Sequence, residues 1–227
     1  MRIFGSLVEL VILDVDGVIL DILGGLCRNL KETAIHFGLP HDLIAQSIRD
    51  IALGKIRIKG NARDSTYMLW PHLNEGQITG FVDFFSEVER RSPYGLIPGS
   101  LEAILFFRDA GMPMALATNN HMKSLLWRLE AAEIDISWFA AIVTKDNPYF
   151  KPHPNTFDPI FAAVSVSRER ALYVGDLQID WDMARNAGVP FAAVVSGGVP
   201  REAFVREGVK ADHIIDRLDD LLAYIEI

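Results

Sequence analysis

The chain has 227 residues, of which 50% are hydrophobic and 23% are charged, and its formal net charge is −8. This composition is typical of a soluble globular protein with one domain, or with one domain and an insertion. An acidic chain without a basic block argues against nucleic acid or an anionic membrane as the main partner. Its one cysteine, Cys27, excludes an internal disulfide, and no segment approaches the roughly 20 apolar residues of a membrane span, so we expect a cytoplasmic protein.

Six short apolar runs predict the strands of one sheet. In chain order they are Val8–Leu13, Met114–Thr118, Ala140–Thr144, Ala171–Gly175, Phe191–Val195 and His213–Ile215. Glu9 interrupts the first run, but the runs are otherwise almost wholly apolar, which is typical of parallel strands that are buried on both faces. Helical patterns occupy 100–111, 122–133, 156–166, 179–188 and 218–227. Alternation of strands and helices predicts an α/β fold with a Rossmann-like parallel sheet and right-handed crossovers.

The region from residue 22 to residue 93 breaks this alternation. It contains four helical patterns, at 27–38, 41–54, 65–73 and 76–91, and no convincing strand. We therefore expect a helical cap domain at 22–93, inserted into a core domain formed by 1–21 and 94–227. Ligands of open α/β sheets bind beyond the carboxyl ends of the strands. Because the insertion follows the first strand, it is a candidate lid over such a site.

Polar side chains follow four of the predicted strands. They are Asp14 and Asp16 after the first strand, Thr118 and Asn119 after the second, Lys151 after the third, and Asp176 with Asp180 after the fourth. In a parallel sheet these strand ends share one edge, so the side chains should converge there. Carboxylate oxygens are suitable ligands for Mg²⁺. Lysine, threonine and free backbone N–H groups suit a phosphate, so the pattern predicts a magnesium and phosphate site.

Four segments carry a resemblance to a known family. LDVDGVILD, LATNN, FKPHP and VGDLQID, in that order, resemble the four motifs of the haloacid dehalogenase-like hydrolases. More closely, they resemble the phosphoglycolate phosphatase-like branch with a helical cap. This resemblance implies a Mg²⁺-dependent phosphatase that hydrolyses a small phosphorylated metabolite, phosphoglycolate-like or a sugar phosphate, through an aspartyl-phosphate.

The resemblance also implies a role for each of these residues. Asp14 would be the nucleophile and a metal ligand, and Asp176 would bind the metal directly. Asp16 would be the general acid and base, with its backbone carbonyl on the metal, and its presence points to phosphate rather than carbon–halogen chemistry. Thr118 and the Asn119 backbone would hold the phosphoryl oxygens while Lys151 neutralises developing charge. Asp180 would orient either Lys151 or a metal-bound water.

Several alternatives stay open at this point. The aspartyl-phosphate would persist in a phosphoglucomutase-like transferase, and a pyrophosphate or phosphonate hydrolase would share the same core residues. A phosphonatase would need a Schiff-base lysine in the cap, where Lys55 and Lys59 are candidates. The basic cluster Lys55, Arg57, Lys59 and Arg63 is either a solvated loop or a contact for a second anionic group of the substrate. A non-catalytic binding homologue would not need the nucleophile.

Overall fold

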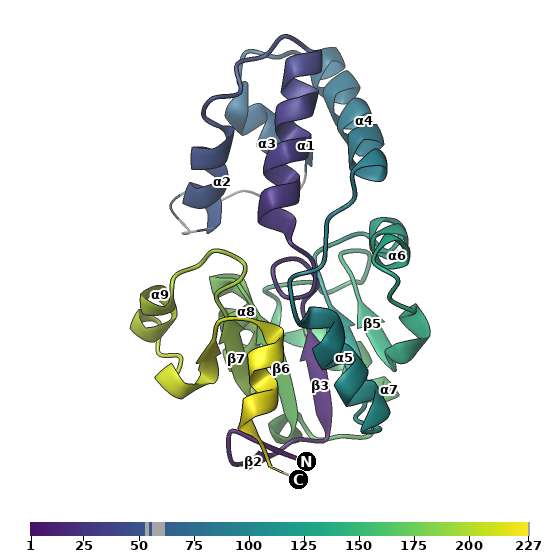
Figure 1. Ribbon diagram of the computed structural model, residues 1–227, viewed down its shortest axis with the longest axis vertical. Helices are drawn as coiled ribbons and strands as arrows, with labels where there is room; N and C mark the ends of the chain where they lie inside the picture. Colours follow the sequence, from purple (N-terminus) through teal and green to yellow (C-terminus); the bar gives the residue numbers. More distant parts are fainter. Residues whose placement is uncertain (53–54, 56–61, 227) are drawn as a thin grey trace. The chain divides into compact units, whose positions relative to one another are not determined.

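The computed structural model describes residues 1–52, 55 and 62–226. The chain divides into two compact units, the first formed by Met1–Asp21 with Leu96–Ile227 and the second by Ile22–Gly95 (Figure 1). Each unit has its own buried apolar core. The function of the second unit as a cap stays a prediction.

A six-stranded sheet forms the centre of the first unit. Its strands are β3 (Leu10–Leu13), β4 (Met114–Ala117), β5 (Ala141–Val143), β6 (Ala171–Gly175), β7 (Phe191–Val194) and β8 (Ile214–Ile215). They lie in the order β5-β4-β3-β6-β7-β8, and all neighbours are parallel. The predicted α/β fold with a Rossmann-like parallel sheet is therefore confirmed. Each of the six runs provides one strand, and the polar residues Glu9, Thr118, Thr144 and His213 fall outside the strands, so the strand residues can be buried on both faces.

Helices connect the strands of this sheet. They are α5 (Ser100–Asp109), α6 (Met122–Ala131), α7 (Asp158–Ala163), α8 (Gln178–Ala187) and α9 (Arg201–Arg206). Short 3-10 turns also occur, at η1 (Ile136–Trp138), η2 (Pro154–Phe157), η3 (Arg168–Arg170), η4 (Ala211–His213) and η5 (Leu218–Tyr224). The α8 helix packs on β6 and β7, so its first turn begins beside the carboxyl ends of these strands.

The end of the chain differs from the sequence-based prediction. We expect a helix at 218–227, but η5 is followed by β9 (Ile225–Glu226), which pairs with β1 (Arg2–Ile3). A tight turn at Phe4 and Gly5, both at positive φ, returns the chain to β2 (Ser6–Leu7), which also pairs with β1. Strands of two residues have no periodicity of their own, and this pairing joins opposite ends of the chain, so a local pattern cannot predict it.

The described part of the second unit contains four helices. They are α1 (Ile22–His36), α2 (Ile44–Ala52), α3 (Ala62–Leu69) and α4 (Glu75–Arg91). The α4 helix packs on α1 and α3, and α1 also packs on α2. Their shared core contains the buried rings of Trp70 and Phe81, whose centroids are 4.9 Å apart. No helix in the described part of the chain combines the length and apolar character that a membrane crossing requires.

Candidate active site

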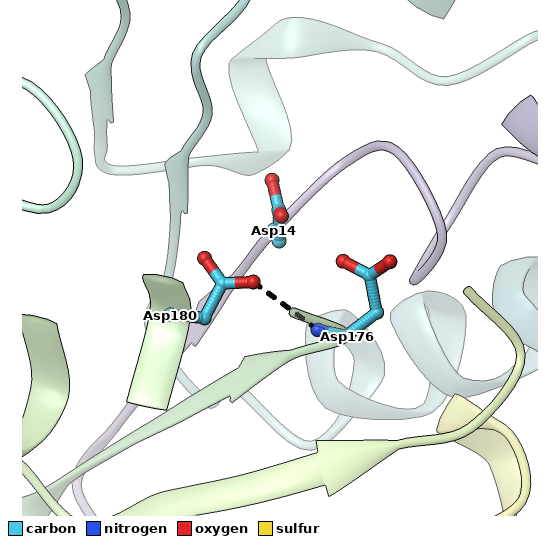
Figure 2. A group of neighbouring side chains, drawn as sticks. All are labelled: Asp14, Asp176 and Asp180. Atoms are coloured by element: carbon cyan, nitrogen blue, oxygen red, sulfur yellow. Dashed lines mark hydrogen bonds between the residues drawn. The ribbon is translucent and has the colours of Figure 1, made fainter. Parts of the chain in front are cut away.

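Two aspartates occupy neighbouring strand ends in the centre of the sheet. Asp14 directly follows β3 and Asp176 directly follows β6, and Leu13 is the register partner of Val174. The third acid, Asp180, comes from the first turn of α8. Figure 2 shows the three carboxyl groups together, and one oxygen of each lies within 4.8 Å of the others. Their exposed fractions are 4% for Asp14, 3% for Asp176 and 0% for Asp180.

Lys151 is the buried cation of this cluster. Its Nζ lies 2.7 Å from Asp14 Oδ2 and 2.8 Å from Asp180 Oδ1, and it donates to the Tyr173 hydroxyl at 3.1 Å. Burial by itself would lower the pKa of Lys151, but the attraction of Asp14 and Asp180 outweighs burial and raises that pKa above its usual range. Lys151 therefore remains protonated and offsets part of the negative charge.

The remaining negative charge favours a bound cation. Burial raises the pKa of Asp14 to about 7, although the attraction of Lys151 opposes this rise and repulsion from Asp180 adds to it. Burial, followed by repulsion from Asp14 and Asp180, raises the pKa of Asp176 well above its usual value. Three buried carboxylates thus face one lysine, and a divalent cation would compensate for the excess charge.

The surroundings of Asp176 fit this requirement. Its Oδ1 is buried and has no hydrogen-bond partner among the described residues. A Cβ added at Gly17 would lie 2.1 Å from Asp176 Oδ2, and one added at Gly197 would lie 1.7 Å from it. Only glycine therefore leaves room for this carboxylate at both positions. Hard carboxylate oxygens with a free lone pair are the ligands that Mg²⁺ prefers, so the donor set fits the expected metal.

Asp180 is held in place by donors from several directions. Its Oδ2 accepts from the backbone N of Asp176 at 3.3 Å and of Leu177 at 3.0 Å. Its Oδ1 accepts from the Tyr173 hydroxyl at 2.6 Å as well as from Lys151. Of the two roles left open for Asp180, the direct contact favours orientation of Lys151. Tyr173 is not among the site residues predicted from the sequence, because it lies inside an apolar run and only its hydroxyl reaches the cluster.

We predict that Tyr173→Phe loosens this cluster. Burial and the nearby Asp180 raise the pKa of Tyr173 well above its usual value, so its hydroxyl stays protonated and donates. Loss of a hydrogen bond to a charged group should lower the free energy of unfolding by about 1.5–3 kcal/mol. Urea denaturation measures this, with Tyr224→Phe as the control, because Tyr224 is exposed. Equal stability of the two variants would contradict the prediction.

Asp16, Thr118 and Asn119 border the cluster. Asp16 is partly exposed, and its carboxylate contacts Arg128 of α6 rather than the other aspartates. Thr118 is buried, and its Oγ1 accepts from the backbone N of Asn120 at 3.2 Å. Asn119 Nδ2 donates to the backbone O of Lys151 at 3.4 Å, whereas its buried Oδ1 has no partner in the described part of the chain. The structure thus brings the residues of all four motifs to one edge of the sheet.

Two cations of the basic cluster are paired within the second unit. Lys55 Nζ lies 3.1 Å from Asp50 Oδ1. Arg63 pairs with Glu75 and donates to Thr79 Oγ1 at 2.9 Å. Arg57 and Lys59 lie outside the described residues. These ion pairs favour the interpretation that Lys55 and Arg63 are solvated surface side chains.

The comparison with known proteins establishes the class. The model of the haloacid dehalogenase-like hydrolase family matches residues 11–194, and the chain belongs to this family, as the four motifs predict. A phosphoglycolate phosphatase of Mesorhizobium japonicum is 36% identical over 130 residues, which are 56% of this chain and 55% of that protein. One of Rhodobacter capsulatus is 35% identical over 104 residues, 45% of this chain and 46% of that protein. The chain thus spans about half the length of these two relatives.

Two solved structures share the fold. A predicted phosphoglycolate phosphatase from Haemophilus somnus has a TM-score of 0.78 at 21% identity, covering 95% of this chain and 97% of that one. CbbY from Rhodobacter sphaeroides, solved with xylulose-1,5-bisphosphate, has a TM-score of 0.71 at 17% identity, covering 97% and 100%. At these identities the likeness concerns the fold alone.

Proposed function

We propose that this protein is a Mg²⁺-dependent phosphatase that hydrolyses a small phosphorylated metabolite through an aspartyl-phosphate intermediate. The observation that carries the proposal is the position of Asp14. It lies at the end of a central strand, 2.7 Å from a buried lysine and beside Asp176. The relatives named phosphoglycolate phosphatase support a phosphate ester as the substrate.

In the first step a carboxylate oxygen of Asp14 attacks phosphorus, and the bond from phosphorus to the ester oxygen breaks. Thr118 and the Asn119 backbone hold the phosphoryl oxygens, and Lys151 neutralises part of the developing charge. Asp16 gives its proton to the leaving oxygen, so an alcohol departs. A Mg²⁺ ion held by Asp14, Asp176 and the backbone carbonyl of Asp16 would supply further positive charge to the phosphoryl group.

In the second step water hydrolyses the aspartyl-phosphate. Asp16, now ionised, takes a proton from the water as its oxygen attacks phosphorus. The bond between phosphorus and Asp14 breaks, which regenerates the Asp14 carboxylate and releases inorganic phosphate. The catalytic cycle therefore returns both aspartates to their starting forms.

The test is hydrolysis of p-nitrophenyl phosphate in Mg²⁺ and in EDTA. We expect hydrolysis in Mg²⁺ and none in EDTA. Rates with phosphoglycolate, sugar phosphates and pyrophosphate would then show which of these substrates the enzyme prefers. Phosphate transfer between glucose phosphates, without release, would instead indicate a mutase. In a phosphonatase, borohydride would reduce the Schiff base between a lysine and the substrate to a stable amine, which would link the two covalently. No hydrolysis of any phosphate ester would overturn the proposal.

Metal binding can be tested without turnover. We predict that Mg²⁺ raises the melting temperature of the wild type, because it binds the folded carboxylate cluster and stabilises it by mass action. In Asp176→Asn most of this rise should disappear, since the neutral amide lacks the negative charge of the carboxylate whose Oδ1 has no partner among the described residues. Asp182→Asn is the control, because Asp182 pairs with Arg185 on α8. An unchanged Mg²⁺ response in Asp176→Asn would mean that the Asp176 carboxylate charge does not contribute to metal binding.

A further inference from the structure

Arg128 is a charged residue next to the site for which the four motifs assign no role. It comes from α6, and its Nη1 lies 3.3 Å from both carboxylate oxygens of Asp16. The same Nη1 donates to Asn120 Oδ1 at 2.8 Å. The side chain of Arg128 is 10% exposed and that of Asp16 is 28% exposed. Arg128 thus reaches from a helix to the loops that follow β3 and β4.

The contact between Arg128 and Asp16 fixes the orientation of the Asp16 carboxyl group, but it is too long to be a strong hydrogen bond. One nitrogen equidistant from both oxygens defines the direction in which the Asp16 carboxyl group faces. The distance of 3.3 Å exceeds the roughly 2.7–2.9 Å of a strong charge-assisted hydrogen bond. Such a contact can hold the carboxyl group in place and still leave its oxygens free to exchange a proton.

The contact with Asn120 orients a second side chain. A guanidinium group can only donate hydrogen bonds, so the amide of Asn120 must turn its oxygen towards Arg128. Its Nδ2 is buried and has no partner among the described residues. The backbone N of Asn120 donates to Thr118 Oγ1, which is one of the expected phosphate contacts. Arg128 therefore connects the expected general acid to the expected phosphate-binding loop.

We propose that Arg128 is a positioning residue that aligns Asp16 for both of its proton transfers. The inference rests on the proposed phosphatase function. Arg128 itself makes or breaks no bond in the reaction, and it acts by holding the Asp16 carboxyl group towards the ester oxygen in the first step. It holds the same group towards the attacking water in the second step.

The inference predicts a dependence on the leaving group. An alkoxide leaves poorly unless it is protonated, whereas p-nitrophenolate leaves as a stable anion. Arg128→Met should therefore lower kcat for an alkyl phosphate by about 10–100-fold, which is the range typical for loss of a side chain that orients a metal ligand. In a single turnover with p-nitrophenyl phosphate, release of nitrophenolate should stay close to the wild-type rate. The second step should be slow, so the phosphorylated enzyme should accumulate.

The experiment compares wild type, Arg128→Met, Arg128→Lys and Lys123→Met. Lys123→Met removes an exposed positive charge from the same helix and should behave as wild type. Arg128→Lys should restore part of the alkyl phosphate rate, because it keeps the charge. Rapid-quench kinetics gives the nitrophenolate burst, and mass spectrometry of the intact protein gives the phosphorylated fraction. Thermal melts establish that each variant is folded.

The outcomes separate this inference from the proposed function. An equal loss on both esters with no phosphorylated enzyme, or no loss in Arg128→Met, would overturn the positioning role. Wild-type protein without phosphatase activity would overturn the proposed function and the inference with it. Accumulation of phosphorylated enzyme in Arg128→Met, with wild-type behaviour of Lys123→Met, would support both.

Discussion

Asp14→Asn should lower phosphatase activity by a factor on the order of 10⁴ or more, the range seen when a covalent nucleophile is removed. The amide is a poor nucleophile, and it keeps the size of the carboxyl group, so the fold should be retained. The variant also removes one charge from a buried cluster that contains three carboxylates and one lysine. We therefore expect an inactive protein that is at least as stable as the wild type in EDTA.

The measurement is kcat with p-nitrophenyl phosphate, together with a urea denaturation curve. Asp182→Asn is the matched control, because it makes the same change outside the cluster on α8. Asp14→Ala is a second variant that cannot return to aspartate by deamidation. Substantial activity in both Asp14 variants would mean that no aspartyl-phosphate forms on this residue.

Lys151→Met should have the largest effect on stability. Lys151 contacts Asp14, Asp180 and Tyr173, and all four side chains are buried. Removal of one partner from a buried ion pair leaves uncompensated charge and typically costs about 3–5 kcal/mol. In EDTA we expect the free energy of unfolding of Lys151→Met to fall by this amount. Activity should also be lost, because no lysine would neutralise the negative charge on the phosphoryl group.

Urea denaturation of Lys151→Met and Lys210→Met in EDTA gives the comparison. Lys210 is exposed, and its replacement should change stability by no more than about 0.5 kcal/mol. Mg²⁺ should restore part of the stability of Lys151→Met, since it supplies positive charge to the same carboxylates. A cost below about 1 kcal/mol in EDTA would mean that the aspartates accept protons readily enough to replace the lysine.

The sheet could be predicted because a strand that is buried on both faces requires a short run of apolar residues in the sequence. The run that ends at Leu13 and the run that ends at Gly175 contain almost no polar residues, and they form the adjacent strands β3 and β6. A polar residue directly after such a run must lie at a strand end. For this reason the positions of Asp14 and Asp176 could be expected at one edge, whereas their roles as nucleophile and metal ligand stay predictions.

The local hydrophobic pattern did not predict the structure of the C-terminal segment, where pairing between distant strands competes with helix formation. The segment 218–227 has helical periodicity, but its end forms β9 against β1 at the other end of the chain. The boundaries of five of the six core strands differ from the predicted ones by one or two residues, whereas β6 has the predicted bounds. The first apolar run begins at Val8, for example, whereas β3 begins at Leu10.

The sequence by itself determined the α/β class, the order of the strands along the chain and the acids and lysine that follow them, because hydrophobic burial and strand ends are local properties. Only the tertiary structure decided which side chains complete the site. Tyr173 reaches Asp180 from inside an apolar strand, and Arg128 reaches Asp16 across 112 positions of the chain. Such contacts depend on how separate elements pack, so they cannot be predicted from the spacing of residues along the chain.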